Sequence, residues 1–442
     1  MKAHLIVQLR PGVSLPEAPH WAAVIRDKQE AHESLLPAID AVLRAAHVPV
    51  WVSREYAPRA GDWSPDEVAA GLDRVYRLVL QREGSIPPAL IADVELIPQV
   101  ERVHVGGIAA SPLPAPVAMQ VSARTDQESR DAIRLPEAHR LTRGSPEITV
   151  AVLDTGVSAE HPELERVFKP GFDFVDILDG HDDFIGDYLG ADADPADDVG
   201  HGTHVSGIIA AAGVAMPTGV APRCRILPVR VLGAMRQGDE RVGAGLIDNI
   251  NNAFKWAVDQ GADVISASLG VPREGGGLPH DDVVRYARSR GVTIVAAAGN
   301  DGQHALYYPG ALRGVIAVGA TAGDGEMAPF STYGDQILCV APGENIYSTY
   351  LDRDYAFASG TSQATPFVSG AIALMKSYER ELTGATLSDA SIKHVIKHTS
   401  DRLDGRLKHP KAGYGRLNVR DALRLIEHRL GARRDARSVI AA

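Results

Sequence analysis

From about residue 128 onwards, the chain alternates between apolar runs and amphipathic stretches. Six nearly continuous apolar runs occur, at residues 148–153, 225–232, 262–270, 292–299, 314–320 and 336–343. Such runs are typical of parallel strands that are buried on both faces of a sheet. Between them, residues 247–260 place Ile247, Ile250, Phe254, Ala257 and Val258 along one side of a helix. The alternation predicts an α/β fold, with a mainly parallel twisted sheet flanked by helices on both faces.

The N-terminal region, residues 1–108, has a different pattern. Strand-like runs at 5–10, 74–80 and 100–107 surround helical spacing at 17–46 and 88–98, which predicts a small α+β domain. Residues 109–127 are rich in Ala, Pro and Ser without periodicity, so we expect a linker there. The larger domain then spans 128–425. Residues 426–442 are expected to hold the end of a helix and a tail, frayed over 433–442.

Composition narrows the classes of protein and partner. The 442 residues are 45% hydrophobic, as in a soluble globular protein, and the net charge of −11 argues against nucleic acid or an anionic membrane as a partner. We find neither an apolar run long enough to span a bilayer nor a signal-peptide core. The two cysteines, Cys224 and Cys339, lie in apolar runs and suit buried free thiols. We therefore expect a cytoplasmic protein.

Three segments place reactive side chains at strand ends or helix starts. Asp154 ends an apolar run before Thr-Gly, where it can orient a histidine, bind a metal or cap a turn. His201 and His204 lie in GHGTHVSG, a spacing that can ligate zinc, but neither a carboxylate base nor a third ligand follows. We therefore interpret His204 as a packed ring and His201 as a base. Ser362 follows Gly360-Thr361 and opens a small-residue helix, as an N-cap or as a nucleophile.

Taken together, these residues favour one chemistry. The chain order Asp, His, Ser is one of the known orders of a serine hydrolase triad, in which the histidine takes the proton of the serine and the aspartate orients the imidazole. Asn300 follows an apolar run and a glycine, so its amide can project into a cleft. Together with the backbone N–H of Ser362, that amide can stabilise an oxyanion.

Eight short motifs occur in order along this region. They are DTG (154–156), GHGTHVSG (200–207), SLG (268–270), AAAGN (296–300), YPG (308–310), PFST (329–332), APG (341–343) and GTSQATP (360–366). With these motifs, residues 128–425 resemble the subtilisin family of serine proteases. The resemblance implies a serine endopeptidase that forms an acyl-enzyme on extended polypeptide substrates and requires no cofactor. It assigns Asp154, His201 and Ser362 as the triad and Asn300 as an oxyanion donor.

The resemblance also implies substrate-binding residues. The segment Ser268-Leu269-Gly270 is expected to pair with extended substrate, and Thr361 to support the oxyanion site. The further substrate-binding residues that it implies are Ala298, Gly299 and Tyr307.

The N-terminal region is similar, more weakly, to the inhibitory propeptides of that family, in its order of elements and in its ending ELIPQVERVHVGG. The resemblance implies a ferredoxin-like domain that helps a slow-folding parallel sheet to form and inhibits the enzyme intramolecularly. Its tail would occupy the cleft as a product-like strand, with cleavage within 106–127. The alternative is an unrelated α+β domain.

The chain departs from the family pattern at four places. Gln363 stands where many relatives carry methionine, so we expect no peroxide inactivation there. Tyr307 stands where relatives often have a small residue, at the floor of the primary specificity pocket, which favours small or medium side chains in the substrate. Residues 210–222 lack the asparagine-bearing loop that binds calcium in many relatives. The ten aspartates in 173–198 suit either a solvated loop or calcium, with Asp192, Asp194, Asp197 and Asp198 as candidate ligands.

Three other functions compete with a general endopeptidase. The chain could be a protease dedicated to maturing one peptide or protein. It could be a catalytically silent binding module whose cleft is permanently blocked by the N-terminal region. A metallohydrolase using His201, His204 and Asp154 is the third alternative.

Overall fold

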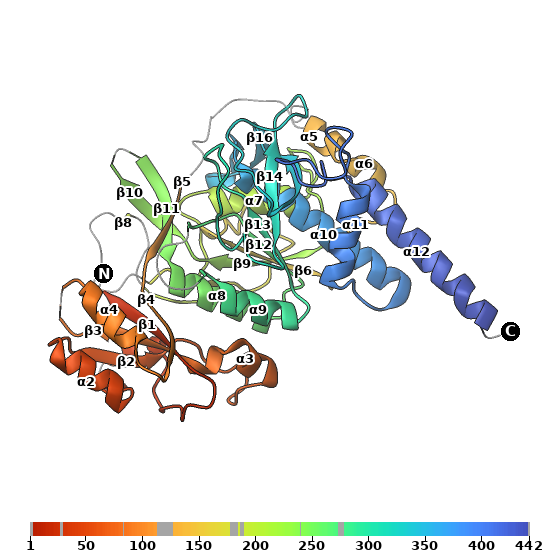
Figure 1. Cartoon of the computed structure of the whole chain (residues 1–442). Coiled ribbons are helices and arrows are strands. Elements are labelled where there is room, and N and C mark those ends of the chain that lie inside the picture. Colours follow the sequence, from red (N-terminus) through yellow and green to blue (C-terminus); the bar gives the residue numbers. More distant parts are fainter. Residues whose placement is uncertain are drawn as a thin grey trace.

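A parallel sheet forms the centre of the molecule (Figure 1). The computed structural model describes residues 3–26, 30–82, 84–112, 127–176, 184–185, 190–238, 240–272 and 278–440. Within this part, the sheet has the order β15-β14-β13-β12-β6-β9-β7, and every neighbouring pair is parallel. Its strands are β6 (Thr149–Asp154), β7 (Phe172–Asp173), β9 (Arg225–Arg230), β12 (Val264–Ala267), β13 (Thr293–Ala297), β14 (Ile316–Thr321) and β15 (Ile337–Pro342). Each of the six apolar runs overlaps one of these strands, which confirms the predicted α/β fold.

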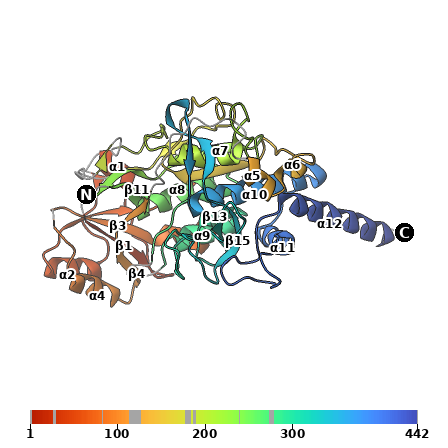
Figure 2. The same ribbon diagram turned by 90° about the horizontal axis from the view of Figure 1, so that it is seen from above.

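Helices cover both faces of this sheet (Figure 2). One face packs against α7 (His201–Ala210) and α10 (Thr361–Thr383), with α11 (Asp389–Thr399) and α12 (Val419–Ile440) behind α10. The other face packs against α8 (Ile247–Asp259) and α9 (Asp281–Ser289). Strand β6 serves both cores, because Val150 and Val152 face the first and Ala151 and Leu153 the second. Helix α12 continues to residue 440, so most of the expected frayed tail is helical.

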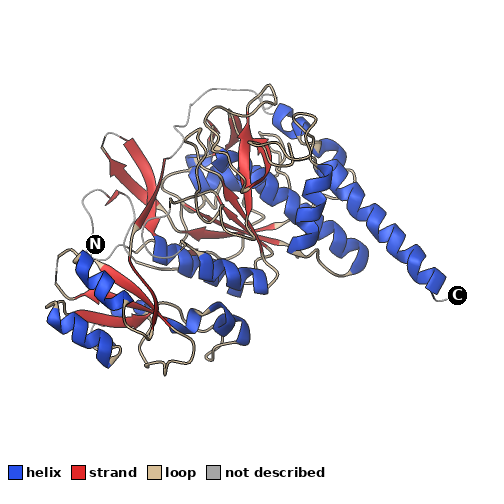
Figure 3. Cartoon of the chain, in the orientation of Figure 1, coloured by secondary structure: helices blue, strands red, loops and turns tan. Residues whose placement is uncertain are grey.

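The N-terminal region forms an antiparallel sheet of order β2-β3-β1-β4 (Figure 3). Its strands are β1 (His4–Leu9), β2 (Val50–Arg54), β3 (Val75–Leu80) and β4 (Val100–Val105). Its helices are α1 (Trp21–Arg26), α2 (Pro37–Ala45), α3 (Pro65–Ala70) and α4 (Pro88–Glu95), with a 3₁₀ turn at Leu72–Arg74. The strand order is that of the ferredoxin-like fold. A separate hydrophobic core beneath α2 and α4 stabilises this sheet.

A third sheet has the order β5-β11-β10-β8. Its strands are β5 (Ile108–Pro112), β8 (Phe184–Ile185), β10 (Gly233–Gln237) and β11 (Glu240–Leu246). Residues 109–112 of the expected linker are therefore a strand, while 113–126 lie outside the described residues. The remaining elements are α5 (Gln127–Ala132), α6 (Leu135–Ala138), a 3₁₀ turn at Leu351–Arg353, and the hairpin of β16 (Ile346–Thr349) and β17 (Tyr355–Ala358).

Among the described helices, none combines the length and the apolar composition needed to cross a bilayer.

Candidate active site

The candidate site lies at the carboxyl edge of the parallel sheet, where side chains from different strands converge. Asp154 is the last residue of β6, and Ser268 and Ala298 directly follow β12 and β13. Helices α7 and α10 pack against each other and begin at His201 and Thr361. The fold thus brings residues that are distant in sequence to one edge of the sheet.

The closest pair in this site is Asp154 and His201. The Nδ1 atom of His201 donates a hydrogen bond of 2.6 Å to the Oδ1 atom of Asp154, and both side chains are buried. The Nε2 atom of His201 has no hydrogen-bond partner among the described residues. Burial lowers the pKa of His201, but the charge and hydrogen bond of Asp154, with the charge of Asp197, raise it to a net value above the ordinary one. Asp154 therefore holds His201 in one tautomer, and the Nε2 atom of His201 is available as a base.

Ser362 lies in the first turn of α10 and is 5% exposed. Its hydroxyl group donates a hydrogen bond of 3.1 Å to the backbone carbonyl of Ser268, rather than to His201. The Ser268 hydroxyl in turn donates to the carbonyl of Ser362 at 2.9 Å. These two contacts fix the start of α10 against the segment that follows β12.

Asn300 is anchored to the same helix start through Thr361. The Oδ1 atom of Asn300 accepts hydrogen bonds from the backbone N–H of Thr361 at 2.7 Å and from its hydroxyl at 2.9 Å. Because its oxygen is committed to Thr361, the amide presents its Nδ2 atom as a donor beside Gly360. Asn300 is exposed, so a ligand can reach this donor.

The other expected substrate-binding residues form the two segments beyond β12 and β13. Leu269 is buried in the core on the α8 side, and Ala298 is buried at the end of β13. Gly270 and Gly299 lie on either side of Tyr307, whose side chain is partly exposed. Each of these residues lies near the start of α10 or beside Tyr307.

His204 points away from this site. Its Nε2 atom donates to the backbone carbonyls of Ile346 and Ala356, at 3.0 and 3.1 Å. Burial and the neighbouring His201 lower the pKa of His204 to about 3, so the ring is neutral. These contacts fasten the β16–β17 hairpin to α7. Among the described residues, His204, His201 and Asp154 do not form a group that could hold a metal ion.

The four candidate calcium ligands do not converge. The Oδ2 atom of Asp197 accepts hydrogen bonds from the backbone N–H and the hydroxyl of Thr203. The Asp197 carboxylate thereby caps the start of α7. Asp198 pairs with Arg230 at 3.3 Å. Asp192 accepts the backbone N–H of Asp194 at 2.8 Å. Within the described ranges, no group of three or more acidic, His or Cys side chains is arranged to hold a metal, although 177–183 and 186–189 lie outside them.

The loop after α7 is organised around a carboxylate. Glu163, 1% exposed, accepts hydrogen bonds from four consecutive backbone N–H groups of that loop, at 2.6–3.2 Å. The donors are Gly213, Val214, Ala215 and Met216. N–H groups directed at a carboxylate cannot ligate a cation, so these residues do not fit the calcium ion that many relatives bind at this loop.

Sequence reasoning missed the edge on which an extended chain is seated. Strand β5 pairs antiparallel with β11, with Ala109 opposite Gly245 and Ser111 opposite Gly243. The backbone N–H of Ile247 extends the pairing to the carbonyl of Gly107 at 3.0 Å. The small residues in VGAGL (242–246), just before the predicted helix at 247–260, were the available signal, since they permit close backbone approach.

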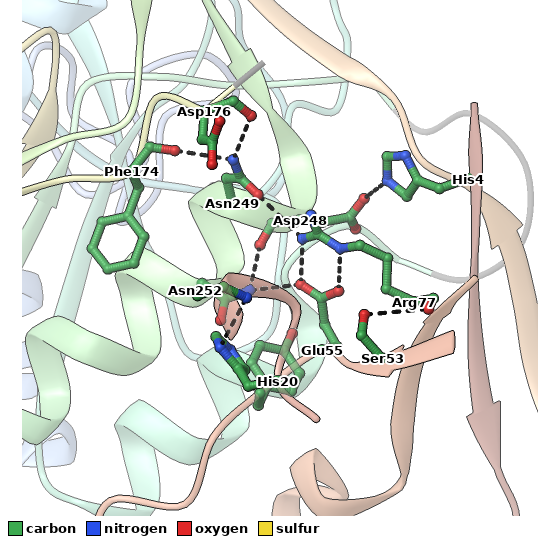
Figure 4. Close-up of polar contacts among 12 residues, drawn as sticks. His4, His20, Ser53, Glu55, Arg77, Phe174, Asp176, Asp248, Asn249 and Asn252 are labelled. Atoms are coloured by element: carbon green, nitrogen blue, oxygen red, sulfur yellow. Dashed lines mark hydrogen bonds and ion pairs between the residues drawn. The ribbon is translucent and has the colours of Figure 1, made fainter. Parts of the chain in front are cut away.

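The N-terminal sheet rests on α8 and α9 through buried polar side chains (Figure 4). Arg77 of β3 forms two hydrogen bonds with Glu55, at 2.7 and 2.8 Å, and a third with Asn249 of α8 at 3.1 Å. Asn252 donates to Glu55 at 2.6 Å. On the same helix, Asp248 pairs with the N-terminal region at 2.8 Å through His4. The two parts also share a buried hydrophobic cluster, in which Ile6, Tyr56 and Leu72 belong to the same core as α8 and α9, so the contact between them is both polar and apolar.

Comparison with known proteins agrees with this geometry. Residues 145–415 match the subtilase family, peptidase family S8. The chain is 39% identical to the thermophilic serine proteinase of Bacillus sp. strain AK1, over 64% of this chain and 63% of that relative. It is 39% identical to the major intracellular serine protease of Bacillus subtilis, over 62% and 86%, and 38% identical to thermitase of Thermoactinomyces vulgaris, over 62% and 88%. Because the family match covers more than half of its residues, this chain belongs to the subtilase family.

Proposed function

We propose that this protein is a serine endopeptidase in which Ser362 is the nucleophile, His201 the general base and Asp154 the residue that orients the imidazole. Membership of the subtilase family supports the endopeptidase activity. The observation that carries the assignment of roles is the buried 2.6 Å contact between Asp154 and His201, which leaves Nε2 without a partner in the described structure. An imidazole held in this way accepts a proton at Nε2 only.

The reaction proceeds in two steps. Ser362 Oγ turns from the Ser268 carbonyl, loses its proton to His201 Nε2 and attacks the substrate carbonyl carbon. The C–N bond then breaks, and the leaving amine takes that proton, which leaves an ester on Ser362. Water, deprotonated by His201, attacks the ester; the acid product leaves and Ser362 regains its proton. Reorientation of the hydroxyl is compatible with catalysis, because such contacts commonly tighten only when substrate binds.

Two donors stabilise the oxyanion that forms in each step. The Asn300 amide nitrogen is one, since its oxygen is held by Thr361 and its orientation is thereby fixed. The backbone N–H of Ser362 is the other, in the first turn of α10, where the positive end of the helix dipole favours negative charge. Both donors are set before the substrate arrives, which is the source of their catalytic effect.

The N-terminal region acts as an intramolecular inhibitor until it is processed. The strand that follows this region, β5, occupies the edge of β11, where an extended substrate would otherwise pair. The surface of α8 that the N-terminal region covers carries the polar side chains of Asp248, Asn249 and Asn252. Apolar residues of the N-terminal region also belong to the hydrophobic core on the α8 side, so release would expose both polar and apolar side chains. Cleavage between 106 and 127 would release β5.

The protein works in a reducing compartment, the cytoplasm. Cys224 and Cys339 are free and buried. Burial raises the pKa of Cys224 to about 11 and that of Cys339 to about 12, which keeps both thiols protonated and unreactive. Such thiols are usual in cytosolic proteins. Two relatives, from Bacillus subtilis and Paenibacillus polymyxa, bear the name of intracellular serine proteases.

The activity is tested with a fluorophosphonate probe and a protein substrate on the full chain, before and after limited proteolysis. We expect labelling and hydrolysis that disappear in Ser362→Ala, and a fall of about 10⁴-fold in kcat for Asp154→Asn, which fixes the wrong tautomer. N-terminal sequencing of the fragments locates the processing site in the wild type and its absence in Ser362→Ala. No labelling in either state would identify a silent binding module. Cleavage of a single protein among many would identify a dedicated processing protease.

The inhibitory role is tested with Arg77→Ala. This change leaves Glu55 buried without its cation, which weakens the contact with α8. We expect peptide hydrolysis by the full chain to start with a shorter lag. Arg82→Ala is the control, because Arg82 is exposed just after the end of β3, the strand that carries Arg77. Equal lags in Arg77→Ala, the control and the wild type would refute inhibition by the N-terminal region.

A further inference from the structure

The hairpin of β16 and β17 connects the helix of the proposed base to the proposed nucleophile. Only Ser359, Gly360 and Thr361 lie between the end of β17 and Ser362. The first strand, β16, packs along α7, which begins with His201 (Figure 1). The two strands pair antiparallel over their whole length. A displacement of the hairpin would therefore change where His201 and Ser362 lie relative to each other.

Consecutive side chains at the end of β16 donate hydrogen bonds to the backbone of α7. The Ser348 hydroxyl donates to the carbonyl of His204, and the Thr349 hydroxyl donates to that of Thr203, both at 2.7 Å. The strand approaches the helix closely at Gly207, where an added Cβ atom would collide with both hydroxyl oxygens. The contact between β16 and α7 is therefore close and hydrogen-bonded.

His204 makes the reciprocal contact from the helix to the hairpin. Its Nε2 atom donates to the carbonyls of Ile346 on β16 and Ala356 on β17, at 3.0 and 3.1 Å. Because a carbonyl oxygen only accepts, the ring carries its proton on Nε2 and shares one N–H between the two strands. The Nδ1 atom is buried and has no hydrogen-bond partner among the described residues. Together with the pKa of about 3, this shows a neutral imidazole in a single tautomer.

Apolar packing also brings the two catalytic helices together. Helices α7 and α10 contact each other, and Val205, Ile208 and Val368 belong to one apolar core between them and the sheet. Such packing has no preferred direction, whereas a hydrogen bond requires its donor and acceptor to be aligned. The hydrogen bonds of the hairpin therefore add a directional constraint. They fix the start of α7 relative to the chain that enters α10.

His204 is the residue that fixes α7 to both strands of the hairpin. Proton transfer requires the Ser362 hydroxyl to come within hydrogen-bond reach of His201 Nε2, and a displacement of about 1 Å can lower the rate by about 10²-fold. We infer that His204 is a positioning residue for this proton transfer, which acts through the hairpin and does not contact the substrate. The inference rests on the proposed function, because it presupposes that Ser362 and His201 react.

The test compares two variants of His204 by kcat and KM for a peptide anilide, on the full chain after limited proteolysis. His204→Phe keeps the ring but has no donor, so two buried carbonyls lose their partner. His204→Gln carries an amide nitrogen as many bonds from the backbone as Nε2 and keeps the donor. We expect kcat to fall by about 10- to 10²-fold in His204→Phe with KM within about twofold, and His204→Gln to recover most of this loss.

A control separates positioning from a general loss of stability. Ile396→Ala truncates a buried side chain on α11, a helix that packs on β15 and α12. It should lower the unfolding midpoint at least as much as His204→Phe and leave kcat unchanged. If His204→Phe does not fold, the double variant Ser348→Ala/Thr349→Val takes its place. It removes the two hydroxyl hydrogen bonds to α7 and should lower kcat at least about threefold with KM unchanged.

The outcomes distinguish this inference from the proposed function. Fluorophosphonate labelling of Ser362 in the wild type reports the proposed function by itself. If the wild type is labelled, an unchanged kcat in His204→Phe, or in the double variant that replaces it, would overturn the positioning role alone. Equal losses of kcat in His204→Phe and Ile396→Ala, or a His204→Gln variant no more active than His204→Phe, would also overturn it. Absence of labelling and hydrolysis in the wild type, before and after limited proteolysis, would overturn both.

Discussion

The hydroxyl group of Thr155 donates a hydrogen bond of 2.9 Å to the Oδ1 atom of Asp197, which joins the end of β6 to the start of α7. The same hydroxyl accepts the backbone N–H of Gly202, also at 2.9 Å. Thr155 follows Asp154 in the chain, and Gly202 follows His201. The hydrogen bond between Thr155 and Gly202, the chain neighbours of Asp154 and His201, thus holds the two proposed catalytic residues together. Asp197 accepts the hydrogen bond that the Thr155 hydroxyl donates.

This arrangement predicts a pH effect for Asp197→Asn. The negative charge of Asp197 contributes to raising the pKa of His201, and His201 must be neutral to act as a base. The pKa of His201 sets the acidic limb of the profile of kcat/KM against pH. Removing the charge of Asp197 should lower this pKa and move the limb to lower pH. The weakened cap of α7 should also lower the free energy of unfolding by about 1 kcal/mol. The pH profile and urea unfolding measure the two effects.

A neighbouring carboxylate provides the control for this variant. Asp194 is exposed in the same acidic stretch. Asp194→Asn removes the same charge without touching α7 and should leave the profile in place. If both variants shift the acidic limb equally, the effect is a general one of net charge and the specific role of Asp197 is wrong.

Asn300 yields a prediction about kcat. Removing one oxyanion donor costs about 10²–10³ in kcat, a value known from this family, so Asn300→Ala should lower kcat by that factor with little change in KM. Asn300→Asp keeps an oxygen for Thr361 but lacks the donor, and it should be as impaired as the alanine variant. Recovery of activity in Asn300→Asp would mean that anchoring Thr361, rather than donation to the oxyanion, is what matters. Gln303→Ala, exposed in the same loop, is the matched control.

The sequence predicts most of the central sheet because its signal is local. A strand such as β6 is buried on both faces, so its apolar run is visible without knowledge of its neighbours. Strand β5 is different, since it is stabilised by pairing with β11, some 130 residues further along the chain. Its Ala- and Pro-rich sequence is that of a linker when read alone. Strand β2, VWVSR, was missed because it is short and half of it is polar or partly exposed.

The site shows the same division between local and non-local information. Motif order indicated Asp154, His201 and Ser362, and the structure places them at one edge of the sheet. The acidic stretch could not be interpreted in this way, because aspartates that cap a helix, pair with arginine or bind calcium have the same composition. Asp197 caps α7 and Asp198 pairs with Arg230. Only the fold distinguishes these uses, since each depends on a partner elsewhere in the chain or on the geometry of a helix start.

The four backbone hydrogen bonds that the loop after α7 donates to Glu163 predict an effect on stability. Glu163→Gln leaves a neutral side chain with one acceptor oxygen facing four N–H donors, so we expect a loss of about 2 kcal/mol in the free energy of unfolding. Urea unfolding measures this change. Glu160→Gln is the control, because Glu160 lies three residues before Glu163 and is highly exposed. Since Glu163 accepts hydrogen bonds from the loop that binds calcium in relatives, a chelator should not lower the unfolding midpoint of the wild type. A large drop with chelator would show that a cation stabilises this enzyme elsewhere.

Gln363 predicts that the proposed active site resists inactivation by peroxide. The side chain is fully buried next to Ser362, and its amide oxygen lies close to Gly360. A glutamine cannot form a sulfoxide, whereas a methionine there would become larger and polar on oxidation, beside the nucleophile. We therefore expect wild-type activity to survive peroxide, and Gln363→Met to lose most of its activity with the same time course as oxidation of that methionine. Peptide mass spectrometry and residual hydrolysis, measured on the same samples, check this. Inactivation of the wild type at the rate of Gln363→Met would place the sensitive group at another residue.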